Sequence, residues 1–232
     1  MAAPHRTRGV QRHASNVPPK PLTKETDVRP FSRRGPAQRP ADTGRADRHR
    51  HRGDGPLPGR DRLCLVQLSD GRGDEHLVRF SPGSDYSAPN LKALLGDPGR
   101  LKIYHFARFD LAIMRAYLNV MASPVYCTRT ASRLVRTYTD RHGLKELVKE
   151  ILAQDLSKQQ QTSDWGAPDI SDAQREYAAS DVRYLHQLMA KLDERLKREN
   201  RVDLAQACFD FLPARAMLDL AGWAEEDIFA HV

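Results

Sequence analysis

The chain has 232 residues, of which 40% are hydrophobic, and its formal net charge is +7. This length suits one domain of roughly 100–200 residues with an appendage, and the apolar fraction is sufficient for a core. No apolar run approaches the ~20 residues of a membrane span, and the N-terminus shows no apolar segment of a signal peptide, so we expect neither a membrane protein nor a secreted one.

The three cysteines, Cys64, Cys127 and Cys208, are odd in number, far apart and without metal-ligand spacing, so we expect buried thiols in a reducing cytoplasm.

The basic charge is unevenly distributed. Residues 1–60 hold 14 Lys and Arg against 5 Asp and Glu, which leaves 23 against 25 for residues 61–232. A nucleic-acid groove on the folded part must therefore come from the local placement of charges.

Residues 1–60 do not read as a folding sequence. They contain only seven of the residues Val, Ile, Leu, Met, Phe, Tyr and Trp, while Arg, Pro, Gly and His dominate. Too little apolar surface is present to offset the entropy of ordering, which predicts a disordered or aberrant basic segment. A basic arm that touches RNA is one interpretation, and the genetic code gives a second one below.

From residue 61 the composition changes to alternating strands and helices, which predicts an α/β layer fold. Apolar and alternating runs predict strands at 63–68, 75–80, 101–106 and 125–128, the first two paired as a hairpin across a Gly- and Asp-rich turn. Amphipathic patterns predict helices at 89–95, 109–118, 130–138 and 144–152.

After a polar connector at 155–169, one long helix is predicted from about residue 171 to 198, capped by Ser171 or Asp172. Tyr177 and Asp181 are four residues apart and so share one face, next to an apolar stripe of Val182, Leu185 and Leu188. The plain interpretation is a half-exposed helix whose polar pair has no role. The functional one is a reaction centre beside a buried face.

Two further helical stretches, 204–212 and 214–221, are predicted in a tail that packs on the domain.

Asp110 stands where a predicted strand gives way to a helix, the position at which open α/β sheets place ligands. Alternatively, Asp110 is an ordinary first-turn acid that complements the helix dipole.

Four separated segments resemble the ribonuclease D-like branch of the 3′–5′ exonucleases, the DEDD superfamily with tyrosine in its third motif. They are the strand 63–68, the segment 105–110 ending in Phe-Asp, the connector 158–165 and the Tyr-x-x-x-Asp of 177–181. After Trp165 the chain has Gly-Ala-Pro-Asp where the family often has Arg-Pro-Leu, which marks a subfamily.

The resemblance implies a ribonuclease H-like fold, with a mixed central sheet flanked by helices. Residues 61–195 would form the exonuclease domain and residues 196–232 a C-terminal helical extension packed on it, and residues 61–232 look like the short bacterial form.

The family's chemistry implies two divalent cations, Mg²⁺ or Mn²⁺, that stabilise the negative charge of phosphodiester hydrolysis. An Asp-x-Glu pair on the first strand and the counterparts of Asp110 and Asp181 would hold them, while Tyr177 would orient the attacking water. The implied substrate is the 3′ end of RNA or single-stranded DNA. Phe109 and Lys158 are candidate nucleic-acid contacts, and no membrane or obligate protein partner is inferred. Other possible backbone contacts, for which solvated surface charge is the plainer interpretation, are Arg133, Arg136 and Lys145.

The first motif of the family is absent, because no Asp-x-Glu precedes Leu63 and the nearby acids Asp47, Asp54 and Asp61 lie in no strand-like run. In this fold the first strand is the middle of the sheet, between the strands 63–68 and 101–106. Its loss would leave two buried ladders without a partner, which is costly. The first, central strand is therefore doubtful in this chain.

The codons of Arg48 to Pro56 offer an explanation. Read one nucleotide later, the alternating Arg and His codons permit Ala-Ile-Asp-Thr-Glu-Ala-Met-Gly, with the aspartate over Arg50 and the glutamate over Arg52. We hypothesise that the segment from near the start to about 55–58 is translated from a wrong frame. Codons that cannot yield Asp-x-Glu there would refute this. The alternatives are a non-catalytic nucleic-acid-binding relic, or a misfolded product of a damaged gene.

Overall fold

The computed structural model describes residues 62–73, 75–157, 159–160, 163–167 and 169–231, so the basic segment 1–60 and Lys158 lie outside the described residues. The strands are β1 (Leu65–Ser69), β2 (Glu75–Arg79), β3 (Lys102–Tyr104) and β4 (Val125–Cys127). The helices are α1 (Pro89–Gly96), α2 (Ala107–Leu118), α3 (Thr128–Val135), α4 (Leu144–Leu152), α5 (Asp172–Arg183), α6 (Leu185–Arg198) and α7 (Val202–Leu220).

The predicted hairpin is confirmed. β1 and β2 pair antiparallel from Leu65 opposite Arg79 to Ser69 opposite Glu75. The turn between them uses Gly71 at a φ of 76°, a left-handed conformation that glycine adopts without steric cost, and its N–H donates to the Ser69 hydroxyl at 3.1 Å. The alternation of apolar residues along the two strands and the glycine in the turn, both visible in the sequence, thus account for this ladder.

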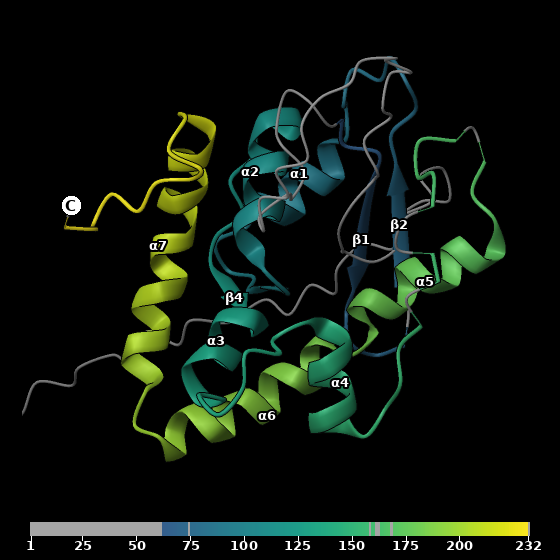
Figure 1. The fold of residues 1–232 in the computed structure, drawn as a ribbon. Helices are drawn as coiled ribbons and strands as arrows, with labels where there is room; N and C mark the ends of the chain where they lie inside the picture. The colour runs from purple at the N-terminus through teal and green to yellow at the C-terminus, as the bar shows by residue number, and fades with distance from the viewer. Residues whose placement is uncertain (1–61, 74, 158, 161–162, 168, 232) are drawn as a thin grey trace, which may run out of the picture.

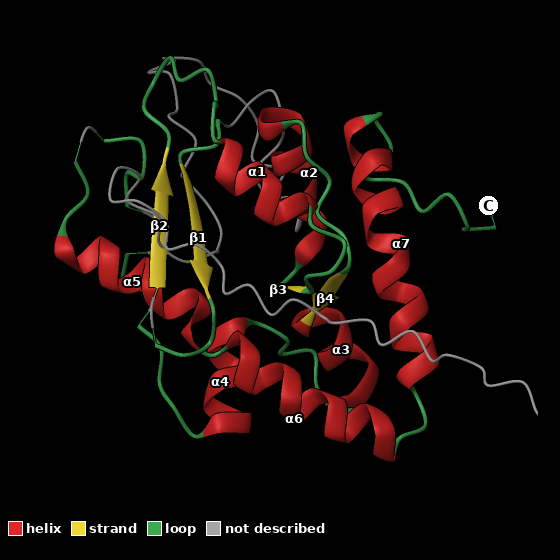
Figure 2. Ribbon diagram, turned by 180° about the vertical axis from the view of Figure 1, so that it is seen from behind, coloured by secondary structure: helices red, strands yellow, loops and turns green. Residues whose placement is uncertain are grey.

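β3 and β4 form a second, parallel ladder, from Lys102 opposite Val125 to Tyr104 opposite Cys127. Parallel neighbours need a crossover connection, which α2 supplies. This helix buries Leu111, Met114 and Leu118 in the main core, as the predicted apolar face requires. In Figure 1 the β1–β2 ladder lies on the side of the molecule opposite to α7, while Figure 2 shows β3 and β4 between the two.

No ladder joins β1 to β3 within the described ranges, where the strands form two separate two-stranded sheets. A cavity of about 220 Å³ is lined by residues from both ladders, among them Leu68 at the end of β1 and Ile103 of β3. Leu95 of α1 and Leu185 of α6 also line it. The strand that was doubtful from the sequence is therefore not among the described elements.

The prediction of one long helix after residue 171 is wrong, because the helix is interrupted at Tyr184 (φ −105°, ψ 0°). Ser171 does cap its start: Ser171 and Gln174 form a capping box in which each side chain bonds the other's backbone. The break has a tertiary cause. α5 packs against β1 and β2, whereas α6 packs against α3 and α4, so the chain turns between two surfaces.

The prediction of two tail helices is also wrong, because α7 continues through Pro213. Proline removes one helical hydrogen bond, but the neighbouring Leu212 and Ala216 are buried in the main core and hold the helix on α2 and α3. The Arg108 guanidinium of α2 donates to the Asp219 carboxylate of α7 at 2.5 and 2.7 Å. Packing here outweighs the local cost of proline.

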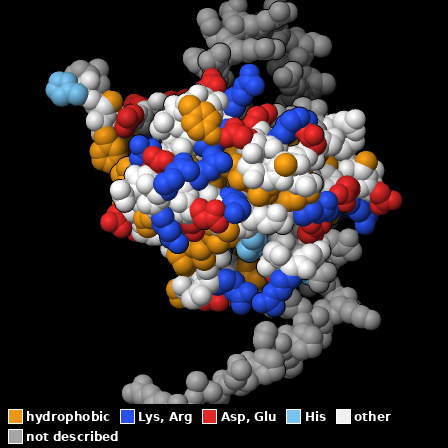
Figure 3. Space-filling view, turned by 90° about the horizontal axis from the view of Figure 1, so that it is seen from below, with side chains coloured by type: hydrophobic (Ala, Val, Ile, Leu, Met, Phe, Trp, Pro, Cys, Tyr) orange, Lys and Arg blue, Asp and Glu red, His pale blue; other side chains and the backbone are white. Residues whose placement is uncertain are grey.

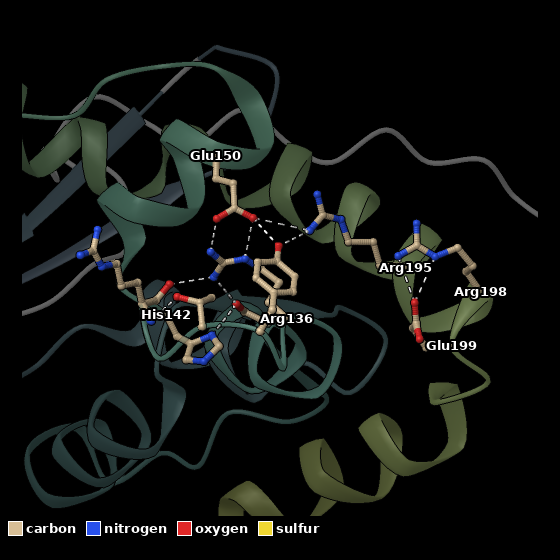
Figure 4. A network of polar contacts seen from close by, with 10 residues as sticks. Arg136, His142, Glu150, Arg195, Arg198 and Glu199 are labelled. Atoms are coloured by element: carbon tan, nitrogen blue, oxygen red, sulfur yellow. Dashed lines mark hydrogen bonds and ion pairs between the residues drawn. The ribbon is translucent and has the colours of Figure 1, made fainter.

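Arg136 is neither a solvated surface charge nor a free nucleic-acid contact, because only 1% of it is exposed. Its guanidinium donates to both carboxylate oxygens of Glu150, to the Ser132 hydroxyl at 3.1 Å and to the Arg141 carbonyl at 2.7 Å (Figure 4). The hydrogen bond from Arg136 is the main reason that the pKa of Glu150 falls to about 2. This network joins the end of α3 to α4.

The surface carries charges of both signs. In Figure 3 Lys and Arg side chains alternate with Asp and Glu over much of the face that is drawn, which agrees with the near balance of charge in residues 61–232. Of the helices in the described ranges, none combines the length and the apolar character that crossing a membrane requires.

Candidate active site

Tyr177 and Asp181 occupy successive turns of α5, and both are half-buried. Between and beside them, Ala178 and Val182 are buried and fix which way the helix faces. Because side chains four residues apart on a helix lie one above the other, the phenol and the carboxylate are presented from the same side of α5. The spacing predicted from the sequence is therefore realised on a helix that is held in place.

The ring of Tyr177 packs on Trp165, with 6.0 Å between the ring centroids. Trp165 is 3% exposed and belongs to a small core with Leu65 and Leu77 of the β1–β2 ladder. The Gln174 side chain donates to the Asp164 carbonyl at 3.0 Å, so the connector is also fastened to α5. The tyrosine is anchored through its ring.

Asp110 lies in the first turn of α2, directly after a sharp corner of the backbone. The corner is made by Phe106, whose left-handed conformation (φ 75°, ψ 49°) costs about 1 kcal/mol or more for a residue with a side chain. The Phe109 ring meets Phe106 edge-on at 4.8 Å, and the Arg129 guanidinium lies over the Phe106 ring at 4.6 Å. An aromatic and arginine cluster therefore stabilises the corner that presents Asp110.

Tyr104 connects the surroundings of the two acids. Burial raises the pKa of its phenol well above the usual value, and the negative charge of Asp110 raises it further. Tyr104 also lines the cavity described above, as does Val182, the residue after Asp181. The helix that carries Asp181 and the strand β3, which precedes the helix of Asp110, therefore border the same cavity.

The second predicted motif is tied to the end of β4. The His105 Nδ1 atom lies 2.9 Å from the Thr128 hydroxyl, which donates to the Tyr104 carbonyl at 3.1 Å. Sequence reasoning missed Thr128 and Arg129, although a signal existed. Both directly follow β4, and the carboxyl ends of neighbouring parallel strands meet at one edge of a sheet.

The described residues do not make a metal site by themselves. Among them no group of three or more His, Cys, Asp or Glu side chains gathers in a way that could hold a metal ion. Asp110 and Asp181 offer two carboxylates, whereas a divalent cation in proteins takes several oxygen ligands. The donor set that is present therefore does not complete a cation site.

Asp110 thus follows the corner between β3 and α2, while Tyr177 and Asp181 share one face of α5, and comparison with known proteins gives the class of this α/β domain. Residues 53–197 match the family model described as 3′-5′ exonuclease, so the chain belongs to that family. It is 38% identical over 144 residues to a ribonuclease D of Gluconacetobacter diazotrophicus, an alignment that covers 61% of this chain and 35% of the relative. The chain thus spans about a third of the length of that curated relative.

Solved structures are similar over more of their length. Brucella melitensis NrnC with bound Mg²⁺ is 54% identical, with a TM-score of 0.72 over 75% of this chain and 85% of that one. The same protein bound to pGG is 55% identical, with a TM-score of 0.73 over 75% and 84%. The predicted ribonuclease D-like family and the exonuclease fold are therefore confirmed.

Proposed function

We propose that this protein hydrolyses phosphodiester bonds from the 3′ end of RNA or single-stranded nucleic acid, as a ribonuclease D- and NrnC-type exonuclease. The observation that carries the proposal is the pair Tyr177 and Asp181 on one face of α5, which packs on the β1–β2 ladder, with Asp110 at the corner between β3 and α2. The Brucella relative bound to pGG favours a nucleic-acid end as the substrate.

The roles follow from the chemistry of the side chains. The carboxylates of Asp110 and Asp181 would be ligands of a divalent cation, Mg²⁺ or Mn²⁺, which the Mg²⁺-bound Brucella relative supports. When bound, a pair of such cations neutralises charge on the scissile phosphate. The Tyr177 hydroxyl would hold the attacking water by a hydrogen bond, at a position fixed by the packing of its ring on Trp165.

The missing acids would come from the shifted reading frame. The family match begins at residue 53, directly after Arg52, whose codon overlaps the glutamate of the alternative frame. The match thus starts within a few residues of the expected end of the wrong-frame segment at about 55–58, which supports a frame error upstream of it. We therefore expect the frame-restored chain, with Asp-x-Glu in place, to be active, and the chain as written to be severely impaired.

Phe109 and Lys158 are the proposed contacts to nucleic acid. The Phe109 ring is half-buried, meets Phe106 edge-on and lies 5.7 Å from the Arg108 guanidinium, a combination suited to stacking on a terminal base.

We place the exonuclease domain at 61–195 and a C-terminal extension at 196–232. The three cysteines are free in the structure, which supports a cytoplasmic location.

The direct test is the polarity of cleavage. A 5′-labelled single-stranded RNA incubated with the frame-restored chain and Mg²⁺ or Mn²⁺ should shorten one nucleotide at a time from its 3′ end, and EDTA should stop this. Asp181→Asn should lower the rate at least about 10³-fold, because it removes a charge from the reacting centre. Asp172→Asn, at an exposed acid in the first turn of the same helix, is the matched control and should keep full activity.

The second candidate function is a non-catalytic nucleic-acid-binding relic. The absence of any three-ligand metal group among the described residues favours it for the chain as written. It predicts that the chain as written binds the labelled RNA in a gel-shift or anisotropy assay but leaves it intact when Mg²⁺ or Mn²⁺ is added. Internal cuts, trimming from the 5′ end or full activity of Asp181→Asn would contradict the exonuclease proposal.

A further inference from the structure

The connector that leads into α5 carries Trp165, on which the ring of Tyr177 packs. Trp165 is 3% exposed and belongs to the small core formed by residues of the β1–β2 ladder and of α5. The next two residues, Gly166 and Ala167, have a hydrogen atom and a methyl group as side chains, and neither can make a hydrogen bond. The segment after Trp165 can therefore be fastened only through its backbone.

Two arginines of the hairpin make hydrogen bonds to this backbone. Arg79, the last residue of β2, donates from Nη2 to the Ala167 carbonyl at 2.7 Å. Arg62, which precedes β1, donates from Nη2 to the Gly166 carbonyl at 3.4 Å and from Nη1 to the Phe80 carbonyl at 2.8 Å. Solvated surface charge is the plainer interpretation of one arginine. Two arginines that donate to consecutive carbonyls, however, form a clamp on the connector.

The residues before Trp165 are fastened to α5 instead. The Gln174 side chain donates from Nε2 to the Asp164 carbonyl at 3.0 Å and to the Ser163 hydroxyl at 3.2 Å. Trp165 therefore lies between a segment held by the helix of Tyr177 and a segment held by the hairpin on which this helix packs (Figure 1). Holding the backbone on both sides restricts where the indole ring can lie.

We propose that Arg62 and Arg79 are positioning residues for Tyr177. They hold the connector so that Trp165 keeps the phenol in one orientation. The inference rests on the proposed function, in which the Tyr177 hydroxyl holds the attacking water. Orientation matters there, because a misplacement of about 1 Å can slow a reaction about 10²-fold. Hydrogen bonds from a charged guanidinium are stronger than neutral ones, which suits arginine to this role.

The first test uses the chain as written and needs no nuclease activity. The sequence has two tryptophans, so Trp223→Phe leaves Trp165 as the only indole, and acrylamide quenching then reports on the connector. In this background, Arg62→Ala combined with Arg79→Ala should at least double the quenching constant, because each lost hydrogen bond makes local opening about three- to tenfold more frequent. Arg72→Ala, at an exposed arginine in the turn of the same hairpin, is the matched control and should leave quenching unchanged.

The second test asks whether the arginines act through the tyrosine. In the frame-restored chain, Arg79→Ala should lower kcat about three- to tenfold with KM nearly constant. In the Tyr177→Phe background, the same substitution should change kcat less than about twofold, because the hydroxyl that it positions is gone. Arg79→Lys keeps a charged donor and should restore most of the lost rate. Melting temperatures within about 2 °C of the parent chain show that the fold is intact.

The two tests distinguish this inference from the proposed function. Unchanged quenching in the double variant overturns the clamp and leaves the exonuclease proposal standing. An equal fall in kcat with and without the Tyr177 hydroxyl also overturns it, because the arginines then act on the fold as a whole. Stronger quenching together with a restored parent chain that does not degrade RNA overturns the proposed function, whereas the hold of the arginines on Trp165 is then upheld by the quenching itself.

Discussion

The guanidinium of Arg183 forms a two-point ion pair with the carboxylate of Glu75, in which the Nη2 atom lies 2.7 Å from Oε2. Arg183 ends α5, and Glu75 begins β2. The hydrogen bonds to Glu75 are the main reason that the pKa of Arg183 is raised above its usual value. This pair fastens the helix that carries Tyr177 and Asp181 to the hairpin on which it packs.

Glu75→Gln should therefore weaken the attachment of α5. Glu75 is 13% exposed, and hydrogen bonds to charged groups are stronger than neutral ones, so we expect a loss of about 1–2 kcal/mol, or roughly 3–6 °C in melting temperature. Glu176, also paired with Arg183 but 66% exposed, provides the control. Glu176→Gln should change stability by less than about 0.5 kcal/mol. Equal melting temperatures for both variants would show that the Glu75 pair does not hold the helix.

Tyr177→Phe should separate the hydroxyl of the tyrosine from its ring. The ring still packs on Trp165, so the melting temperature should stay within about 2 °C of the parent chain. In the frame-restored chain, loss of the hydroxyl should lower kcat about 10²-fold, the usual scale for a group that positions the attacking water, while KM changes little. An unchanged kcat would remove Tyr177 from the reacting centre.

Phe109→Leu should test the proposed stacking on nucleic acid. A leucine keeps apolar bulk beside Phe106 but cannot stack on a base, and stacking on an aromatic ring contributes about 1–3 kcal/mol per base. In steady-state kinetics on short RNA we expect KM to rise about tenfold with kcat nearly constant. A fall in kcat alone would instead indicate that Phe109 supports the corner that presents Asp110.

His142 should contribute to the pH dependence of stability near neutrality. Burial lowers the pKa of this imidazole, and the positive charges of Arg136, Arg133 and Arg129 lower it further. The folded state therefore prefers neutral histidine. Stability should be fully present above the unfolded pKa of about 6.5 and should fall as the pH drops below it.

Thermal melts at pH 7.5 and 5.5 check this sign. The parent chain should melt at a lower temperature at pH 5.5, and His142→Gln should show a smaller difference. Glu150 does not contribute in this window, because its pKa of about 2 places the loss of its ion pair below pH 4.5. His186, whose pKa burial also lowers, should add to the dependence in the same direction. A parent chain that melts higher at pH 5.5 would contradict the assignment.

The features that the sequence predicted correctly depend on residues that are close together along the chain. The helix predicted at 144–152 is α4 with the same bounds, and the pairing of Tyr177 with Asp181 follows from the helical period alone. The start of α5 was predictable because a serine followed three residues later by glutamine makes a capping box.

The remaining features depend on contacts between distant segments. Nothing local predicts the break at Tyr184, which arises because α5 and α6 pack on different surfaces. Phe106 adopts a left-handed backbone that favours glycine, and it does so with Arg129 stacked over its ring. The burial of Arg136 likewise requires Glu150 and the Arg141 carbonyl, which only the folded chain brings to it.

We propose that this exonuclease family member holds one half of a reaction centre, Asp110, Tyr177 and Asp181, and lacks the other half. The most direct measurement compares Mg²⁺-dependent trimming of 5′-labelled RNA by the chain as written and by the frame-restored chain. We predict at least a 10³-fold higher rate for the restored chain, lost again in Asp110→Asn. Equal rates for the two chains would show that the first motif is not needed for the reaction, and a restored chain that is indifferent to Asp110→Asn would remove Asp110 from the reaction centre.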